Sequence, residues 1–118
     1  MSLKRLNRLM ALSAIKRDMD LAELARLAAA RTETRTRLEA LRNSVNAPVA
    51  ADPVLMSVQQ RHRLWAEAQR AELNMALARQ QAAWLEARDR TRRSFGRASV
   101  LERLAQAQGV AAKRHTPS

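Results

Sequence analysis

The chain has 118 residues, with 22 Lys and Arg against 11 Asp and Glu, and it contains two glycines, three prolines and no cysteine. The lack of cysteine excludes disulfide frameworks, thiolate nucleophiles and Cys-ligated metal sites, and so few glycines and prolines leave little material for turns and sheets. Alanine, arginine and leucine are abundant and favour helix. The sequence therefore predicts an all-α protein.

The first predicted helix spans about residues 3–45. Its apolar residues recur at the three- and four-residue spacing of one helix face, and the expected inward stripe is Leu3, Leu6, Met10, Leu21, Leu24, Leu27, Leu38, Leu41 and Val45. Three further apolar residues, Leu12, Ile15 and Met19, lie nearly opposite that stripe. We expect them to bind a partner or a second copy of the chain, with ordinary scattered exposure as the alternative.

Residues 46–52 form the predicted loop. The residue before each proline is pushed out of the α region, and Asn46 can take the left-handed conformation that closes a helix. Asp52 is expected to cap the second helix, with Pro53 as the first helical residue. A loop this short between two long helices predicts an antiparallel two-helix coiled-coil hairpin.

The second predicted helix runs from about 53 to 108 and carries an 11-residue repeat. Eleven residues make three helical turns, so each row of the repeat stays on one face. The two rows are His62, Leu73, Trp84 and Phe95, and Trp65, Ala76, Ala87 and Ala98. We expect Trp65, Leu73, Trp84 and Phe95 to be buried against the first helix. Gly109 is expected to end the helix and the single hairpin domain of residues 1–109, and residues 110–118 to form a flexible basic tail.

Folding the chain about the middle of its loop places Ile15 near Trp84 and Leu3 near Gly96. Residues 97–108 then extend beyond the first helix, and this overhang is both apolar and cationic. Nothing in the chain covers it, so we expect it to bind an acidic partner. With Leu12, Ile15 and Met19, the candidate partner-binding residues are Arg92, Arg93, Arg97, Val100, Leu101, Arg103 and Leu104.

No constellation of catalytic residues is present in the sequence. No Cys, His or carboxylate follows His62 at the three- or four-residue spacing of a metal site, and two glycines cannot form a phosphate-binding loop. We therefore expect a non-enzymatic protein without catalytic residues, cofactor or metal. His62 itself is expected to lie in or beside the seam between the helices.

The positive charge leaves nucleic acid open as a partner, because clustered arginines suffice to neutralise phosphates. The densest cluster is Arg88–Arg93 with Arg97. However, the sequence has no three-helix unit for helix-turn-helix docking, no aromatic platform for single strands and no basic region set apart from a zipper. Nucleic-acid binding is therefore the less favoured alternative, beside a purely structural oligomerisation module.

The N-terminus has basic residues before the apolar run Leu9–Ile15, but charged residues follow this short run at once and no cleavage pattern is present. We expect no signal peptide and no transmembrane segment. The expected location is the cytoplasm, with peripheral association at the inner membrane only through partners.

Both ends of the chain carry patterns of a known family. The N-terminal pattern is Leu6-x-x-Leu9, Ile15-Lys16-Arg17-Asp18, Ala22-Glu23-Leu24-Ala25 and Arg37-Leu38-x-x-Leu41, and the C-terminal one is Trp84-Leu-Glu-Ala-Arg-Asp-Arg with Leu101-Glu-Arg-Leu104. In these patterns the chain resembles the FliJ family, the small coiled-coil stalk proteins of the flagellar type III export ATPase, and the related injectisome stalk proteins. The resemblance implies a non-enzymatic stalk whose helical termini enter the central hole of a hexameric export ATPase. Its exposed side would contact the export gate or chaperones.

Overall fold

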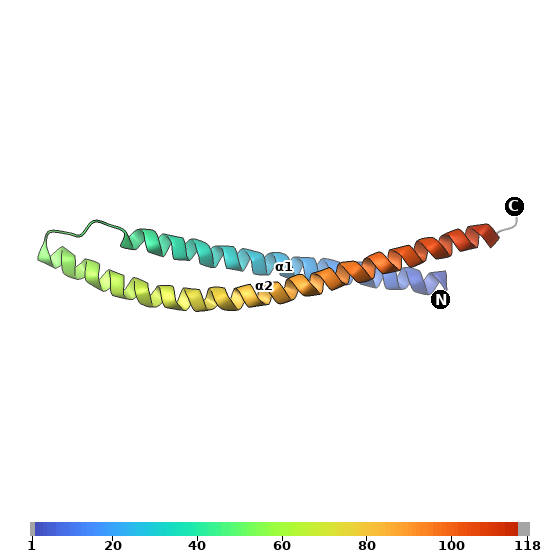
Figure 1. Ribbon diagram of the computed structural model, residues 1–118, viewed down its shortest axis with the longest axis horizontal. Coiled ribbons are helices and arrows are strands. Elements are labelled where there is room, and N and C mark those ends of the chain that lie inside the picture. The colour runs from blue at the N-terminus through green and yellow to red at the C-terminus, as the bar shows by residue number, and fades with distance from the viewer. Residues whose placement is uncertain (1, 116–118) are drawn as a thin grey trace. The chain divides into compact units, whose positions relative to one another are not determined.

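The computed structural model describes residues 2–115, and of residues 110–115 it describes the backbone alone. Two helices, α1 (Leu3–Val45) and α2 (Pro53–His115), are joined by the loop of residues 46–52 (Figure 1). The described part of the chain contains no strand. The chain is an all-α helical hairpin, as its composition and loop predict.

The two helices pair in two compact units. The open-end unit consists of residues 1–26 and 85–118, and the loop-end unit consists of residues 27–84. In each unit a segment of α1 packs against a segment of α2.

The start of α2 is fixed by the predicted cap. The backbone N–H of Val54 donates to the Asp52 carboxylate at 2.9 Å, and that of Met56 donates to the Asp52 carbonyl at 2.8 Å. The end of α1 differs from expectation, because no non-glycine residue of the described chain has a positive φ. Asn46 instead closes the last turn through its N–H, which donates to the Asn43 carbonyl at 3.3 Å.

The far end of α2 also differs from expectation, because the helix passes through Gly109 and ends at His115. Gly109 has no positive φ. A glycine inside a helix costs only about 1 kcal/mol relative to alanine, and the alanines around it favour continuation. The predicted end of the second helix near residue 108 is therefore wrong, because residues 110–115 of the expected tail are helical, and residues 116–118 lie outside the described part.

The buried positions repeat every seven residues, which is the repeat of a two-helix coiled coil. Every residue of the two rows of α1 and the two rows of α2 is buried or half-buried, and we call these rows the seam. In α1 the rows are Leu6, Ser13, Asp20, Leu27, Thr34 and Leu41, and Met10, Arg17, Leu24, Arg31, Leu38 and Val45. In α2 they are Ala66, Leu73, Gln80, Ala87, Ser94 and Leu101, and Leu77, Trp84, Thr91, Ala98 and Ala105.

The predicted 11-residue rows coincide with the seam only in part, at Leu73, Trp84, Ala87 and Ala98. Leu73 and Trp84 are half-buried, but Trp65 is 54% and Phe95 is 45% exposed. Each of these two aromatic residues lies one position away from a seam row. In the predicted stripe of α1, Leu3 and Leu21 are likewise exposed. The most enclosed residues of α2 are small and allow the helices to approach closely: Ala66, Ala87, Thr91 and Ser94.

Contacts in the open-end unit give its register. The hydroxyl of Ser94 donates to the carboxylate of Asp20, and that of Thr91 donates to the Asp20 carbonyl at 3.3 Å. The Arg17 guanidinium carbon lies 5.6 Å from the centre of the Phe95 ring. Folding about the loop midpoint would instead have placed residue 17 beside residue 82, so the pairing is shifted by roughly 13 residues, or more than three helical turns.

The loop-end unit shows the same shift. The Arg31 guanidinium carbon lies 4.4 Å from the centre of the Trp84 ring, and Arg31 donates to the Gln81 side chain at 3.1 Å. Trp84 therefore faces Arg31, and its predicted pairing with Ile15 is wrong. Nearer the loop, the Ser44 hydroxyl lies 3.0 Å from the His62 ring nitrogen, so the offset grows from the loop into the helices.

The loop explains the offset. The Gln59 side chain accepts a hydrogen bond from the Ala50 N–H and donates one to the Pro48 carbonyl, both at 2.9 Å. These bonds hold the loop along the first turns of α2 instead of letting it turn back directly. As a result, α1 meets α2 only near His62.

The predicted overhang of residues 97–108 is also wrong, for the same reason. Arg97 lines a hollow together with Lys16 of α1, and Leu101 is half-buried in the seam. Leu6 is only 1% exposed, and its covering has to come from α2. With both helices rising 1.5 Å per residue, the observed register places Leu6 beside roughly residue 106.

Because the seam is built from small residues, enlarging a seam alanine should destabilise the fold more than enlarging an exposed alanine. Ala87→Leu is expected to lower the free energy of unfolding by about 1–3 kcal/mol, because added methylenes in a close-packed position force strain. The same change at the exposed Ala82 is expected to stay within about 0.5 kcal/mol of the wild type. Urea denaturation followed by far-UV circular dichroism measures both. Equal effects at the two positions would contradict the seam.

Candidate interaction surfaces

The positive charge is concentrated in the open-end unit. Its segments contain 14 Lys and Arg against six Asp and Glu, a net charge of +8, whereas the loop-end unit has eight against five, a net charge of +3. Most of the net charge of +11 therefore belongs to the half of the chain that holds both termini.

Both helices contribute to a basic hollow in the open-end unit. Its volume is about 320 Å³, and it is lined by Lys16, Asp20, Arg90, Arg93, Ser94 and Arg97. The Asp20 carboxylate at its base accepts hydrogen bonds from the Ser94 hydroxyl and from Lys16, the latter at 2.9 Å. The hollow combines four cationic side chains with one carboxylate that is already bonded on both helices. It is suited to an anionic group.

Asp20 is held in its charged form by its neighbours. The Ser94 hydrogen bond is the largest cause that lowers its pKa, followed by the hydrogen bond from Lys16, while desolvation acts in the opposite direction. The hydroxyl of Thr91 links the two helices beside Asp20, since it lies 2.8 Å from the Ala87 carbonyl of α2 and 3.3 Å from the Asp20 carbonyl of α1. A charged carboxylate is thus part of the helix–helix contact.

The candidate residues predicted from the sequence fall into three groups. Arg93 and Arg97 meet at the basic hollow. Leu101 is half-buried in the seam, so it is not freely available to a partner. The remaining candidates are exposed but do not line the hollow: Arg92, Val100, Arg103 and Leu104 on α2, and Leu12, Ile15 and Met19 on α1.

The sequence interpretation missed the other residues of the hollow. Lys16, Asp20, Arg90 and Ser94 were not recognised as a cluster, because a search for apolar stripes ignores Asp and Ser. The seven-residue spacing of Asp20 from Leu27 and of Ser94 from Leu101 would have been the signal. Those two spacings place both polar residues on the buried rows.

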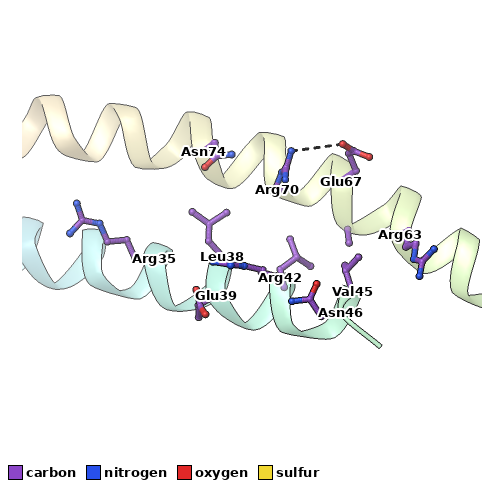
Figure 2. Close-up of a pocket in the computed structure, with 12 residues that line it drawn as sticks. Arg35, Leu38, Glu39, Arg42, Val45, Asn46, Arg63, Glu67, Arg70 and Asn74 are labelled. Atoms are coloured by element: carbon purple, nitrogen blue, oxygen red, sulfur yellow. Dashed lines mark ion pairs between the residues drawn. The ribbon is translucent and has the colours of Figure 1, made fainter. Parts of the chain in front are cut away.

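The loop-end unit contains a larger groove, which we call the arginine groove (Figure 2). Its volume is about 650 Å³. Figure 2 shows Leu38 and Val45 of α1 pointing toward α2. The lining residues are Arg35, Leu38, Glu39, Leu41, Arg42, Val45 and Asn46 on one side and Arg63, Ala66, Glu67, Arg70 and Asn74 on the other.

The groove exists because α2 does not fill it with large apolar side chains. Its nearest seam residue is Ala66, and Arg70 stands one turn further along, where a leucine would close the gap. The only ion pair among the lining residues joins Arg70 to Glu67 at 3.9 Å, and both side chains are largely exposed, so it contributes little. The groove therefore has an apolar floor and a cationic rim.

His62 lies beside the seam, where it was expected. Its ring contacts the Ser44 hydroxyl and lies 5.6 Å from the Trp65 ring. In the described residues, no group of three or more His, Cys, Asp or Glu is placed to hold a metal ion. Neither helix, over its described length, has an apolar stretch sufficient to cross a membrane.

Comparison with known proteins gives no relative. No protein-family model, no curated protein and no solved structure matches the chain. The resemblance to the FliJ family therefore rests on the residue patterns of the sequence alone. The interaction surfaces have to be interpreted from their own chemistry.

The lowered pKa of Asp20 predicts acid sensitivity. The charged carboxylate stabilises the fold above its ordinary pKa of about 4, and this contribution is lost as the pH falls through the lowered pKa. Ser94→Ala removes the largest cause of the shift, so the pKa of Asp20 is expected to rise and the acid loss of stability to begin at higher pH. An NMR titration of the Asp20 carboxyl measures this.

Ser57→Ala provides the control, since Ser57 is exposed and far along the chain from Asp20. It should leave the Asp20 titration unchanged. A wild-type pKa of Asp20 at or above the ordinary value would show that the contact with Ser94 does not hold the charged form.

Proposed function

We propose that the chain is a non-enzymatic helical-hairpin accessory protein that binds an acidic protein partner through its open-end unit. The observation that carries this proposal is the net charge of +8 in that unit, where Arg92, Arg93, Arg97 and Arg103 form no ion pair with a described carboxylate. Cationic groups that are not neutralised within the chain steer and orient an acidic partner.

The geometry of the hairpin supports binding rather than catalysis. Its seam is occupied by helix–helix contacts, and the four cationic side chains that line the basic hollow are exposed. The exposed residues Val100 and Leu104 lie on the same helix as the four arginines. An acidic partner that also carries apolar groups could therefore contact both the arginines and the exposed apolar residues of α2.

The resemblance of the sequence to the FliJ family makes this proposal more specific. The chain would be a stalk or accessory protein of flagellar or related type III protein export, with a hexameric export ATPase as the acidic partner and the export gate or chaperones as further ones. The concentration of charge near both termini supports this form, because a stalk enters its ATPase with its helical termini.

Reversal of charge in the open-end unit tests the proposal. The quadruple change of Arg92, Arg93, Arg97 and Arg103 to glutamate is expected to abolish binding to the purified export ATPase and stimulation of its ATP hydrolysis. Helicity should persist, because the four side chains are exposed and exposed charges contribute little to stability. Co-sedimentation and an ATPase assay measure the two effects.

The matched control reverses four exposed arginines of the loop-end unit, namely Arg35, Arg42, Arg61 and Arg79. The change in net charge is the same. Retained stimulation in the control together with loss in the open-end variant supports the proposal. Equal loss in both variants would show that only total charge matters, and retained stimulation in the open-end variant would place the docking surface elsewhere.

Nucleic-acid binding is the alternative, and salt separates it from protein binding. Non-specific affinity for duplex DNA is expected to fall linearly in log salt, with a slope set by the number of neutralised phosphates. We expect binding by this chain to disappear at physiological salt, as measured by fluorescence anisotropy. Micromolar or tighter binding that persists there would favour a basic coiled-coil nucleic-acid-binding protein.

A further inference from the structure

The loop end of the hairpin carries an exposed apolar surface, which we call the apolar tip. Its members are more than two-fifths exposed and belong to the loop or the first turns of α2: Val49, Val54, Leu55, Met56, Val58 and Trp65. Residues 43–60 contain one charged side chain, Asp52. Its carboxylate caps α2 through the Val54 N–H. The tip thus contrasts with the dense charge of the rest of the chain.

The loop is held in a shape that keeps this surface exposed. Gln59 binds the Ala50 N–H and the Pro48 carbonyl, so these polar backbone groups are satisfied within the chain. Val49, between them, is 65% exposed. A surface that is already ordered loses little conformational entropy on binding.

Cationic residues stand directly behind Val54 and Val58 of the tip. Arg61 follows Val54 and Val58 on one helical face, with Trp65 one turn further along. Arg63 and Arg42 lie on α2 and α1 at the arginine groove. None of these three arginines forms an ion pair with a described carboxylate.

This order, with apolar residues at the end of the hairpin and with arginines and Trp65 together behind them, matches one kind of surface. A bilayer interface presents acyl chains and then the headgroup region, where tryptophan is enriched and the phosphates lie. Contact between the tips of two copies would bring six arginines together without acidic partners, which is unfavourable.

We propose that the apolar tip inserts into the interface of an anionic lipid bilayer, with Arg42, Arg61 and Arg63 against the lipid phosphates. The helices do not cross the bilayer. The surface is separate from the open-end unit, so the proposal is independent of the acidic protein partner.

Vesicle binding tests the proposal on the full chain. The probe is vesicles of phosphatidylcholine with about 30% phosphatidylglycerol, at physiological salt. The wild type is expected to co-sediment with them, and its tryptophan emission to shift to the blue and to be quenched by brominated acyl chains. In Trp65→Phe the blue shift should disappear while co-sedimentation is largely retained, because Trp84 is packed against Arg31.

Val54→Glu and Met75→Glu form a matched pair. Both residues are exposed, at 70% and 61%, and lie on α2, and both changes alter the net charge equally. Glutamate in the first turn of a helix is compatible with its dipole, so Val54→Glu should fold. Val54→Glu is expected to weaken vesicle binding about tenfold, because a charged group replaces an inserted apolar one, whereas Met75→Glu should retain wild-type binding.

Four results would overturn the proposal. The first is no binding by the wild type, and the second is equal weakening by the two glutamate variants. The third is binding without blue shift or quenching, which indicates electrostatic adsorption alone. The fourth is a dimer in light scattering that Val54→Glu converts to a monomer, which would assign the tip to a second copy of the chain.

Discussion

A two-helix hairpin buries only one stripe of each helix, so its seam has to supply stability and register together. The contact of Asp20 with Ser94 and Thr91 fixes the register. Sliding α2 by one turn would take the Ser94 hydroxyl away from the Asp20 carboxylate and the Thr91 hydroxyl away from the Asp20 carbonyl, and the loss of hydrogen bonds in such a position is costly. In the open-end unit, the pairing of Lys16 with Arg93 and Arg97 at the basic hollow follows from this register.

Small seam residues leave the larger apolar and charged side chains for other contacts. Ala66 and Ala87 allow close approach of the helices but bury little area, while Trp65, one position away from the seam, stays exposed. In the loop-end unit, the lack of a large partner for Leu38 and Val45 opens the arginine groove. The groove is thus a consequence of how the seam is filled, whereas the apolar tip is exposed because the loop lies along α2 up to His62.

The fold class and the two inner helix ends could be predicted from the sequence, because Asp52 and Pro53 act locally and helix propensity sums over many residues. The seam could not be predicted from apolar residues alone, since Asp20, Thr91 and Ser94 occupy buried rows and Phe95 does not. The register depends on Gln59, whose bonds to Pro48 and Ala50 leave no local pattern. For that reason the basic hollow and the groove were missed, although Arg93 and Arg97 were recognised as candidates.

The register of the open-end unit is the central claim, and a spin label at Met19 tests it most directly. The chain contains no cysteine, so Met19→Cys gives one labelled site at an exposed position. Paramagnetic broadening of backbone amide signals then reports which part of α2 lies beside it. The seam predicts strongest broadening on α2 around residues 91–95. Strongest broadening around Gln80, the partner expected from folding about the loop midpoint, would contradict it.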